Sequence, residues 1–405
     1  MTYQDTLNWM FSKLPMYQRQ GKSAFKANLD NSISFAHHLN NPQNQIKTIH
    51  VGGTNGKGST SNMLASVLQE AGYKVGLFTS PHLKDFRERI RINGQMVSEQ
   101  FVIDFIEHNK VYLENTGLSF FEMTSGMAFD YFSKNNVDIA IIEVGLGGRL
   151  DSTNIIRPEL SIITNIGLDH IQFLGDTLDK IAFEKAGIIK STIPVVIGKT
   201  QLETKPVFEA IAERLHSPIS FADQLAHVDY ESDLKGIYQT ENKQTVLQAV
   251  LVLRALDYKI DDIHIVNGLI AVTLNTGFQG RWQILQNKPL IVCDTAHNID
   301  GLKLVMQQVQ ELTFNVLHVV FGVVNDKDVL SILDLLPRNA VYYFCKPEVP
   351  RGLDENILSA IFLEHGFQGS TYSSVNKALM AAKSKANCDD MIYVGGSTFV
   401  VAEII

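Results

Sequence analysis

The chain has few cysteines, no excess of basic residues and no long apolar run. Its 405 residues include only Cys293, Cys345 and Cys388, whose scattered positions match neither a metal-binding spacing nor an even-numbered disulfide framework. A formal net charge of -8 disfavours a nucleic-acid-binding protein. No apolar run approaches the length of a membrane span, and the first residues do not resemble a signal peptide. We therefore expect a cytoplasmic protein that has no nucleic-acid or membrane partner.

The length and the pattern of apolar segments predict two α/β domains. The chain is long enough for two separate cores, and 45% hydrophobic with 19% charged residues is ordinary for a globular protein. Residues 137–144 form a continuous apolar run, which is typical of a central parallel strand. Strand-like and helix-like segments alternate before and after it. We predict a P-loop-type, mainly parallel sheet flanked by helices over residues 1–276, followed by a smaller Rossmann-like α/β domain over residues 280–405.

A glycine-rich segment, His50–Thr60, lies between a predicted strand and a predicted helix. Such a turn presents backbone N–H groups to an anion, and the helix dipole strengthens the attraction. Lys57 can reach the outer phosphates of a nucleotide, and a hydroxyl of Ser59 or Thr60 can face phosphate or its Mg²⁺. The segment departs from the standard P-loop because Val51 occupies a glycine position and Gly58 follows the lysine. The alternative is an ordinary strand-to-helix turn.

Polar residues follow three further predicted strands. Ser80, Glu143 and His170 come at strand ends, which is the edge of an open α/β sheet where ligands bind. A carboxylate such as Glu143 is costly to bury unless it is paired or metal-bound. Taken alone, Ser80-Pro81 is also a common turn starter, and a lone histidine is more often packed than a ligand. The charge run 87–91 is interpreted as a solvated face or salt-bridged strand rather than a substrate clamp, and residues 1–45 as mostly helical. Ser98 and Ser119 are predicted to lie at helix starts.

Several segments, in this order along nearly the whole chain, resemble the folylpolyglutamate synthase/dihydrofolate synthase branch of the Mur ligase superfamily. They are Gly53-Thr54-Asn55-Gly56-Lys57-Gly58-Ser59, Ser80-Pro81-His82-Leu83, the run 145–154, Leu168-Asp169-His170, Glu184-Lys185-Ala186-Gly187-Ile188, Asp294-Thr295-Ala296-His297-Asn298 and the run 322–328. Tyr238 replaces the family's histidine, Lys243 its alanine and Gln279 its proline, which leaves the alignment at those positions less secure.

The resemblance implies nucleotide and metal sites. The residues that it assigns to ATP are Asn55, Gly56, Lys57, Gly58, Ser59, Thr60, Asn242, Arg281 and Asp294. Those that it assigns to Mg²⁺, at two sites, are Ser80, Glu143, His170 and a carbamylated Lys185. From chemistry alone an imidazole is an atypical Mg²⁺ ligand, so His170 rests on the resemblance. A carbamate would turn the Lys185 cation into an oxygen donor.

The resemblance also implies an acceptor site and a glutamate site. The folate or pteroate contacts are Phe121, Glu122, Asp151 and Asn154, and the glutamate contacts are His297 and Ser397. From sequence alone the adjacent phenylalanines at a helix start are more typical of a core. The residues implied to be catalytic are Lys57, Lys185 and His297.

The implied activity is that of an ATP-dependent acid–amino-acid ligase. It would add L-glutamate to a folate or dihydropteroate carboxylate through an acyl phosphate, forming dihydrofolate, folylpoly-γ-glutamate or both. A Mur-type cell-wall ligase, a P-loop NTPase or kinase, and a non-catalytic folate- or nucleotide-binding protein remain as alternatives. The family is generally monomeric, so a monomer is expected.

Overall fold

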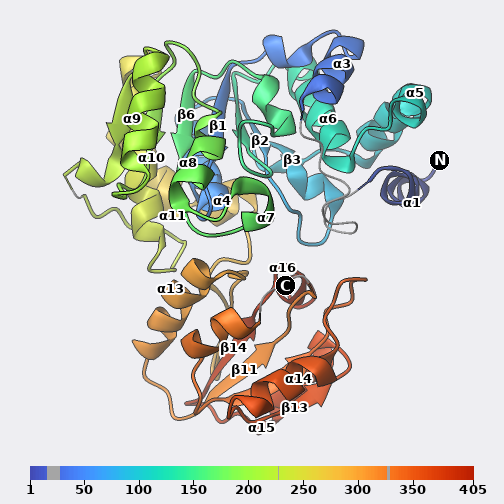
Figure 1. The fold of residues 1–405 in the computed structure, drawn as a ribbon, viewed down its shortest axis with the longest axis vertical. Helices are drawn as coiled ribbons and strands as arrows, with labels where there is room; N and C mark the ends of the chain where they lie inside the picture. Colours follow the sequence, from blue (N-terminus) through green and yellow to red (C-terminus); the bar gives the residue numbers. More distant parts are fainter. Residues whose placement is uncertain (16–27, 227, 326–328) are drawn as a thin grey trace. The chain divides into compact units, whose positions relative to one another are not determined.

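The computed structural model describes residues 1–15, 28–226, 228–325 and 329–405. Internal contacts divide the chain into two units, which are described separately (Figure 1). The first unit contains Met1–Asp233 and Gln239–Gly277, and the second contains Leu234–Tyr238 and Phe278–Ile405. Part of the predicted N-terminal helical region (16–27) and the end of the motif at 322–328 lie outside the described residues.

The first unit is built on an eight-stranded sheet with the order β4-β3-β2-β5-β1-β6-β7-β8. All neighbouring pairs are parallel except β2 with β3 and β3 with β4. The strands are β1 (Thr48–Gly52), β2 (Val75–Phe78), β3 (Ile90–Ile92), β4 (Gln95–Met96), β5 (Ile139–Glu143), β6 (Leu160–Ile163), β7 (Val195–Ile197) and β8 (Ile219–Phe221). Strands β1 and β5 are buried at every residue, as expected where helices cover both faces of a parallel sheet.

The helices of the first unit surround this sheet. They are α1 (Tyr3–Lys13), α3 (Asp30–His38), α4 (Lys57–Glu70), α5 (Glu99–Thr116), α6 (Phe120–Lys134), α7 (Ile171–Leu174), α8 (Leu178–Ala186), α9 (Lys205–Arg214), α10 (Gln239–Ala255), α11 (Asp262–Ile270) and α12 (Val272–Thr276). The predicted helix starts at Ser98 and Ser119 are confirmed, because each serine hydroxyl caps its helix. Helix α11 packs closely on α4 because Gly268 has no side chain: a Cβ there would lie 2.6 Å from the Val67 Cα.

The second unit is a six-stranded sheet with the order β13-β12-β11-β14-β10-β9. Its strands are β9 (Gln283–Asn287), β10 (Leu290–Cys293), β11 (Leu317–Phe321), β12 (Val341–Cys345), β13 (Gly369–Tyr372) and β14 (Met391–Gly395), and only the edge strand β9 is antiparallel. Its helices are α13 (Ile299–Gln310), α14 (Glu355–Glu364), α15 (Val375–Lys385) and α16 (Thr398–Ala402). Two buried clusters pack against this sheet. The predicted fold class, a mainly parallel sheet unit followed by a smaller Rossmann-like unit, is confirmed. Within the described parts of the chain, no helix has the length and apolarity needed to cross a membrane.

Candidate active site

The glycine-rich loop joins the end of β1 to the start of α4 and is held by the segment that follows β6. Gly53 has φ +135°, and a Cβ there would lie 1.9 Å from the Thr164 Oγ1, so only glycine fits. The Thr54 N–H donates to the Asn165 carbonyl at 2.9 Å, and the Asn55 N–H donates to the Asn165 Oδ1 at 2.9 Å. These bonds fix the loop against the carboxyl edge of the sheet, which is where a nucleotide-binding sheet holds its ligand.

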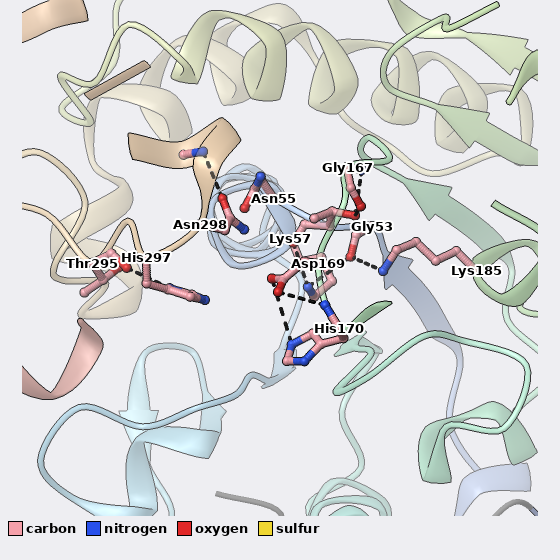
Figure 2. A network of polar contacts seen from close by, with 12 residues as sticks. Gly53, Asn55, Lys57, Gly167, Asp169, His170, Lys185, Thr295, His297 and Asn298 are labelled. Carbon is pink, nitrogen blue, oxygen red and sulfur yellow. Dashed lines mark hydrogen bonds and ion pairs between the residues drawn. The ribbon is translucent and has the colours of Figure 1, made fainter. Parts of the chain in front are cut away.

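Two lysines share one backbone acceptor in this loop. The Lys57 Nζ donates to the carbonyls of Gly53 and Thr54 at 3.0 and 3.2 Å, and the Lys185 Nζ donates to the same Gly53 carbonyl at 2.9 Å (Figure 2). Lys185 lies on α8 and is only 4% exposed. Its burial, together with the charge of Lys57, lowers the pKa of Lys185 to about 7. Lys185 is therefore partly a neutral, nucleophilic amine near neutral pH.

Ser80 and Glu143 lie at the ends of two adjacent strands. Strand β2 pairs with β5, and the Ser80 N–H donates to the Glu143 Oε2 at 3.1 Å. Glu143 is 4% exposed. The structure thus brings together a hydroxyl-bearing residue and a buried carboxylate that were predicted from their positions at strand ends.

A buried arginine next to this pair was not predicted as a site residue. Arg89 is buried, its Nε donates to the His82 Nδ1 at 2.8 Å, and its guanidinium carbon lies 5.4 Å from the Phe120 ring centroid. Burial lowers the pKa of Arg89 to about 10, and the charge of Glu143 acts in the opposite direction. The salt-bridged interpretation of the run 87–91 holds for Arg87, which pairs with Asp85 at 2.7 Å, and is wrong for Arg89. The sequence carries no signal that distinguishes the two arginines, because they alternate along the same charged run.

His170 lies just after the segment that holds the glycine-rich loop. Its backbone is left-handed with φ +51°, and its N–H donates to the Asp169 Oδ1 at 2.9 Å (Figure 2). The His170 Nε2 lies 3.9 Å from the Asp169 carboxylate. Across the residues that the structure describes, no group of three or more His, Cys, Asp and Glu side chains is arranged to hold a metal. The predicted metal ligands therefore include Ser80 and Lys185 in addition to the acid Glu143 and the histidine His170.

Asp151 organises the glycine-rich run that follows β5. Its Oδ2 accepts the N–H groups of Gly145 and Leu146 at 3.0 and 2.8 Å, and its Oδ1 accepts the Thr153 N–H at 3.0 Å and the Thr153 hydroxyl. The carboxylate is 4% exposed, and its burial raises the pKa of Asp151. The side chain predicted to contact folate is thus turned into its own loop, where it sets the backbone conformation.

The other predicted acceptor contacts surround the same run. The Phe121 ring covers Gly145 so closely that a Cβ on Gly145 would lie 2.4 Å from the ring. The Glu122 Oε2 accepts the Ser119 N–H at 2.6 Å, which completes the capping box of α6. The Asn154 Nδ2 donates to the carbonyls of Arg149 and Gly187, both at 3.0 Å, whereas its buried Oδ1 has no hydrogen-bond partner among the described residues.

Helix α10 packs its first turn on the glycine-rich loop. The Gln239 Nε2 donates to the Ser59 Oγ at 3.2 Å, and the Asn242 Nδ2 donates to the Gln239 Oε1 at 2.8 Å. A Cβ on Gly56 would lie 2.2 Å from the Asn242 Oδ1, so this amide lies directly against the loop. The Gly58 carbonyl accepts from the Asn62 Nδ2 at 2.7 Å, and the buried Thr60 Oγ1 has no partner within the described residues.

In the second unit, Asp294 directly follows β10 and is almost fully enclosed. Its Oδ2 accepts the Trp282 N–H at 2.7 Å and the Tyr238 hydroxyl at 2.5 Å, and its Oδ1 accepts the Ala296 N–H at 2.8 Å. It is 1% exposed, and burial raises the pKa of Asp294. Asp294 therefore shapes the loop that begins α13.

The remaining predicted residues of the second unit lie on loops at the carboxyl ends of its strands or just before the sheet. The His297 Nδ1 lies 3.0 Å from the Thr295 carbonyl (Figure 2). The Arg281 guanidinium donates to the Gly280 carbonyl at 3.3 Å and lies 5.7 Å from the Phe278 ring. The Ser397 hydroxyl accepts the Phe399 N–H at 3.2 Å and caps α16. These side chains are held by local contacts.

Two domain models match the chain. Residues 51–261 match the Mur ligase middle domain, and residues 280–398 match the Mur ligase glutamate ligase domain. The chain therefore belongs to the Mur ligase superfamily.

Individual proteins narrow this assignment. The dihydrofolate synthase/folylpolyglutamate synthase of Bacillus subtilis is 32% identical over 99% of this chain and 98% of its own length. A probable bifunctional folylpolyglutamate synthase/dihydropteroate synthase of Haloferax volcanii is 33% identical over all of this chain, which spans 50% of that relative. The crystal structure of the Yersinia pestis folylpolyglutamate synthase/dihydrofolate synthase with AMPPNP and Mn ion has a TM-score of 0.85 at 26% identity, covering 100% of this chain and 97% of that one.

Within the superfamily, this chain belongs to the folylpolyglutamate synthase/dihydrofolate synthase family, as its motifs predicted. The comparisons support an ATP-dependent glutamate ligase of this family over a cell-wall ligase, a kinase or a non-catalytic binding protein.

Proposed function

We propose that this protein is an ATP-dependent ligase that joins L-glutamate to the carboxylate of a folate or of dihydropteroate. The observation that carries the proposal is the convergence of Lys57 and Lys185 on the Gly53 carbonyl. It lies at the sheet edge where Glu143 ends β5 and Ser80 follows β2. A lone glycine-rich turn needs neither a second buried lysine nor a buried acid. Phosphoryl transfer needs both cationic and metal-binding groups near the transferred phosphate.

ATP is proposed to bind at the glycine-rich loop and the start of α4. Lys57 donates to two carbonyls of its own loop, and phosphate oxygens would take their place as stronger, charged acceptors. The backbone N–H groups of Gly56, Gly58 and Ser59, at the start of α4, would then face the phosphates. The Thr60 N–H already donates to the Gly56 carbonyl at 2.8 Å, so Thr60 is proposed to contribute its hydroxyl. Asn242 lies against this loop, and Arg281 and Asp294 are proposed as the contribution of the second unit.

Mg²⁺ is proposed to bind at Ser80 and Glu143, and their chemistry fits this ion. Mg²⁺ prefers oxygen ligands, and the buried Glu143 carboxylate is costly without a cation. When bound, the ion would offset the negative charge of the phosphates. A second site is proposed at His170 and at a carbamylated Lys185. The neutral amine of Lys185 would attack CO₂ to form an N–C bond and release one proton, leaving an anionic carbamate with oxygen donors.

The reaction is proposed to pass through an acyl phosphate. A carboxylate oxygen of the acceptor attacks the γ-phosphorus, and ADP leaves. The amine of glutamate then attacks the acyl carbon, phosphate leaves, and the amine loses a proton. Phe121 and the run shaped by Asp151 are proposed to line the acceptor site with Glu122 and Asn154, and His297 and Ser397 are proposed to bind glutamate. Shielding the acyl phosphate from water would favour the amine as the nucleophile.

Phosphate release from the purified protein tests the proposal. The protein is incubated with Mg-ATP and either 7,8-dihydropteroate or tetrahydrofolate, with and without L-glutamate. We expect release that requires both acceptor and glutamate, and a product heavier by one glutamate residue; the acceptor that works identifies the activity. Release without either substrate would instead identify an NTPase, and no release with either acceptor would refute the ligase. The low cysteine content and the net charge of -8 support a proposed cytoplasmic location without nucleic-acid or membrane partners. A monomer is proposed because the family is generally monomeric.

A further inference from the structure

We propose that Tyr238 and Gln239 couple the glycine-rich ATP loop to the loop that carries Asp294 and His297, which makes Tyr238 a positioning residue for the ligase reaction. The inference rests on the proposed function. The chain changes units at this point: the segment Leu234–Tyr238 belongs by its contacts to the second unit, whereas Gln239 begins a helix of the first unit.

The connecting segment Leu234–Tyr238 is firmly attached within the second unit. Both polar ends of the Gln308 side chain on α13 bind its backbone: the Oε1 accepts the Ile237 N–H at 2.8 Å, and the Nε2 donates to the Lys235 carbonyl at 2.9 Å. The Tyr238 side chain packs against the core of this unit. The segment is therefore part of the second unit's structure and is no free linker.

Tyr238 also completes the environment of Asp294. Its hydroxyl donates to the Asp294 Oδ2 at 2.5 Å, the same oxygen that accepts the Trp282 N–H. The other oxygen holds the Ala296 N–H and so sets the backbone just before His297. Trp282 and Ala296 bind Asp294 through backbone N–H groups, whereas Tyr238 binds it through a side chain whose position depends on the chain that leads to α10. Moving Tyr238 would therefore change how Asp294 holds the His297 loop.

The next residue is attached to the ATP loop. Gln239 is 1% exposed, its Nε2 donates to the Ser59 Oγ, and its Oε1 accepts from Asn242, whose amide lies against Gly56. Adjacent Cα atoms are held about 3.8 Å apart by the peptide bond. A shift of the loop on nucleotide binding that moves Gln239 would therefore be passed to Tyr238 unless backbone rotation between the two residues absorbs it or one of the two anchors breaks.

A pair of tyrosine substitutions tests this coupling. Y238F removes the hydroxyl that binds Asp294 and keeps the ring. Y342F is the matched control, because the Tyr342 hydroxyl is also buried in the second unit and donates to the Pro337 carbonyl at 2.8 Å, far along the chain from the ATP loop. Both variants should lower the thermal midpoint similarly. We expect Y238F alone to lower kcat about tenfold, the scale of one buried hydrogen bond, with AMPPNP affinity unchanged within about twofold.

A double-mutant cycle with Q239L identifies the path. If both residues act through one connection, Q239L and Y238F/Q239L should reduce kcat to a similar extent as Y238F. The second substitution should add no further loss, because the first has already removed the coupling. Equal kcat for Y238F and wild type, an equal loss of kcat in Y342F, or full additivity in the double variant would each overturn the proposal. Wild-type ligation is measured in the same assay, so a failure of the proposed function appears as no activity in any variant and is distinguishable from a failure of the coupling.

Discussion

Asp151 in the first unit and Asp294 in the second are both buried carboxylates in loops after a strand, and they are held in different ways. Each lies in the loop region after a buried parallel strand, each is buried, and each uses both oxygens to accept hydrogen bonds. The partners of Asp151 all lie between Gly145 and Thr153. Asp294 instead depends on Tyr238, which lies 56 residues earlier in the chain. The loop around Asp151 is held by local contacts, whereas the loop around Asp294 also depends on a side chain from a distant segment.

The chemical groups differ between the units as well. The first unit gathers two lysines and a buried acid around one sheet edge, whereas the described site residues of the second unit are mainly held by turns and helix caps. We infer that the first unit supplies most of the charge that acts on the phosphates, and that the second unit mainly positions the substrates. Three experiments test this difference, in order of expected effect.

The largest effect is expected from K57A. Loss of this cation should lower kcat/KM by about 10²- to 10³-fold, because Lys57 is the charged donor proposed to stabilise the developing phosphate charge. The counterpart R281A in the second unit should lower it by only about tenfold. Steady-state kinetics with saturating acceptor and glutamate measure both. Equal losses would mean that the second unit contributes as much charge as the first.

An intermediate effect on stability is expected from D151N and D294N. In each variant an NH₂ group faces backbone N–H groups that the carboxylate had accepted, so we expect losses of about 3 kcal/mol for D151N and about 2 kcal/mol for D294N. Urea unfolding followed by a probe in each unit measures them. The control is D176N, which removes an exposed ion pair with Lys180 and should leave the free energy of unfolding nearly unchanged, because solvent screens such pairs. A larger loss for D294N than for D151N would reverse the comparison.

The smallest effect is expected from the pH dependence of the buried histidines. His50 on β1 lies 2.8 Å from the Thr153 hydroxyl, which in turn donates to Asp151, and burial lowers the pKa of His50 to about 3. Between that value and the unfolded pKa of about 6.5 the unfolded chain binds more protons, so stability falls as pH falls, by up to about 1.4 kcal/mol per pH unit.

Thermal unfolding between pH 7 and pH 5 measures this effect. H50Q should flatten the pH dependence of the first unit, although His82, whose pKa burial also lowers to about 3, retains part of it. In the second unit, burial lowers the pKa of His318, and H318Q is the matched variant. An unchanged slope in H50Q would show that His50 is already protonated or solvated when folded.

Local patterns were sufficient for much of the fold and for the position of the candidate site. The run 137–144 predicted a central strand, and Ser98 and Ser119 predicted helix starts. Glu143 ends β5 and Ser80 lies just past β2, as their predicted strand ends indicated, whereas His170 lies at the start of α7. These inferences succeed because apolar periodicity, helix capping and strand ends are properties of short stretches of chain. Whether the site residues bind the ligands assigned to them stays a prediction.

Other features depend on contacts between residues far apart in sequence. The two mainly parallel α/β units, the glycine-rich loop with its lysine and the family could be inferred from the residues alone. Three features became visible only in the folded chain: Arg89 is buried while Arg87 is paired, Lys185 shares the Gly53 carbonyl with Lys57, and the chain changes units between Tyr238 and Gln239. Packing across the fold sets burial and hydrogen-bond partners, and it also sets the pKa of each buried group.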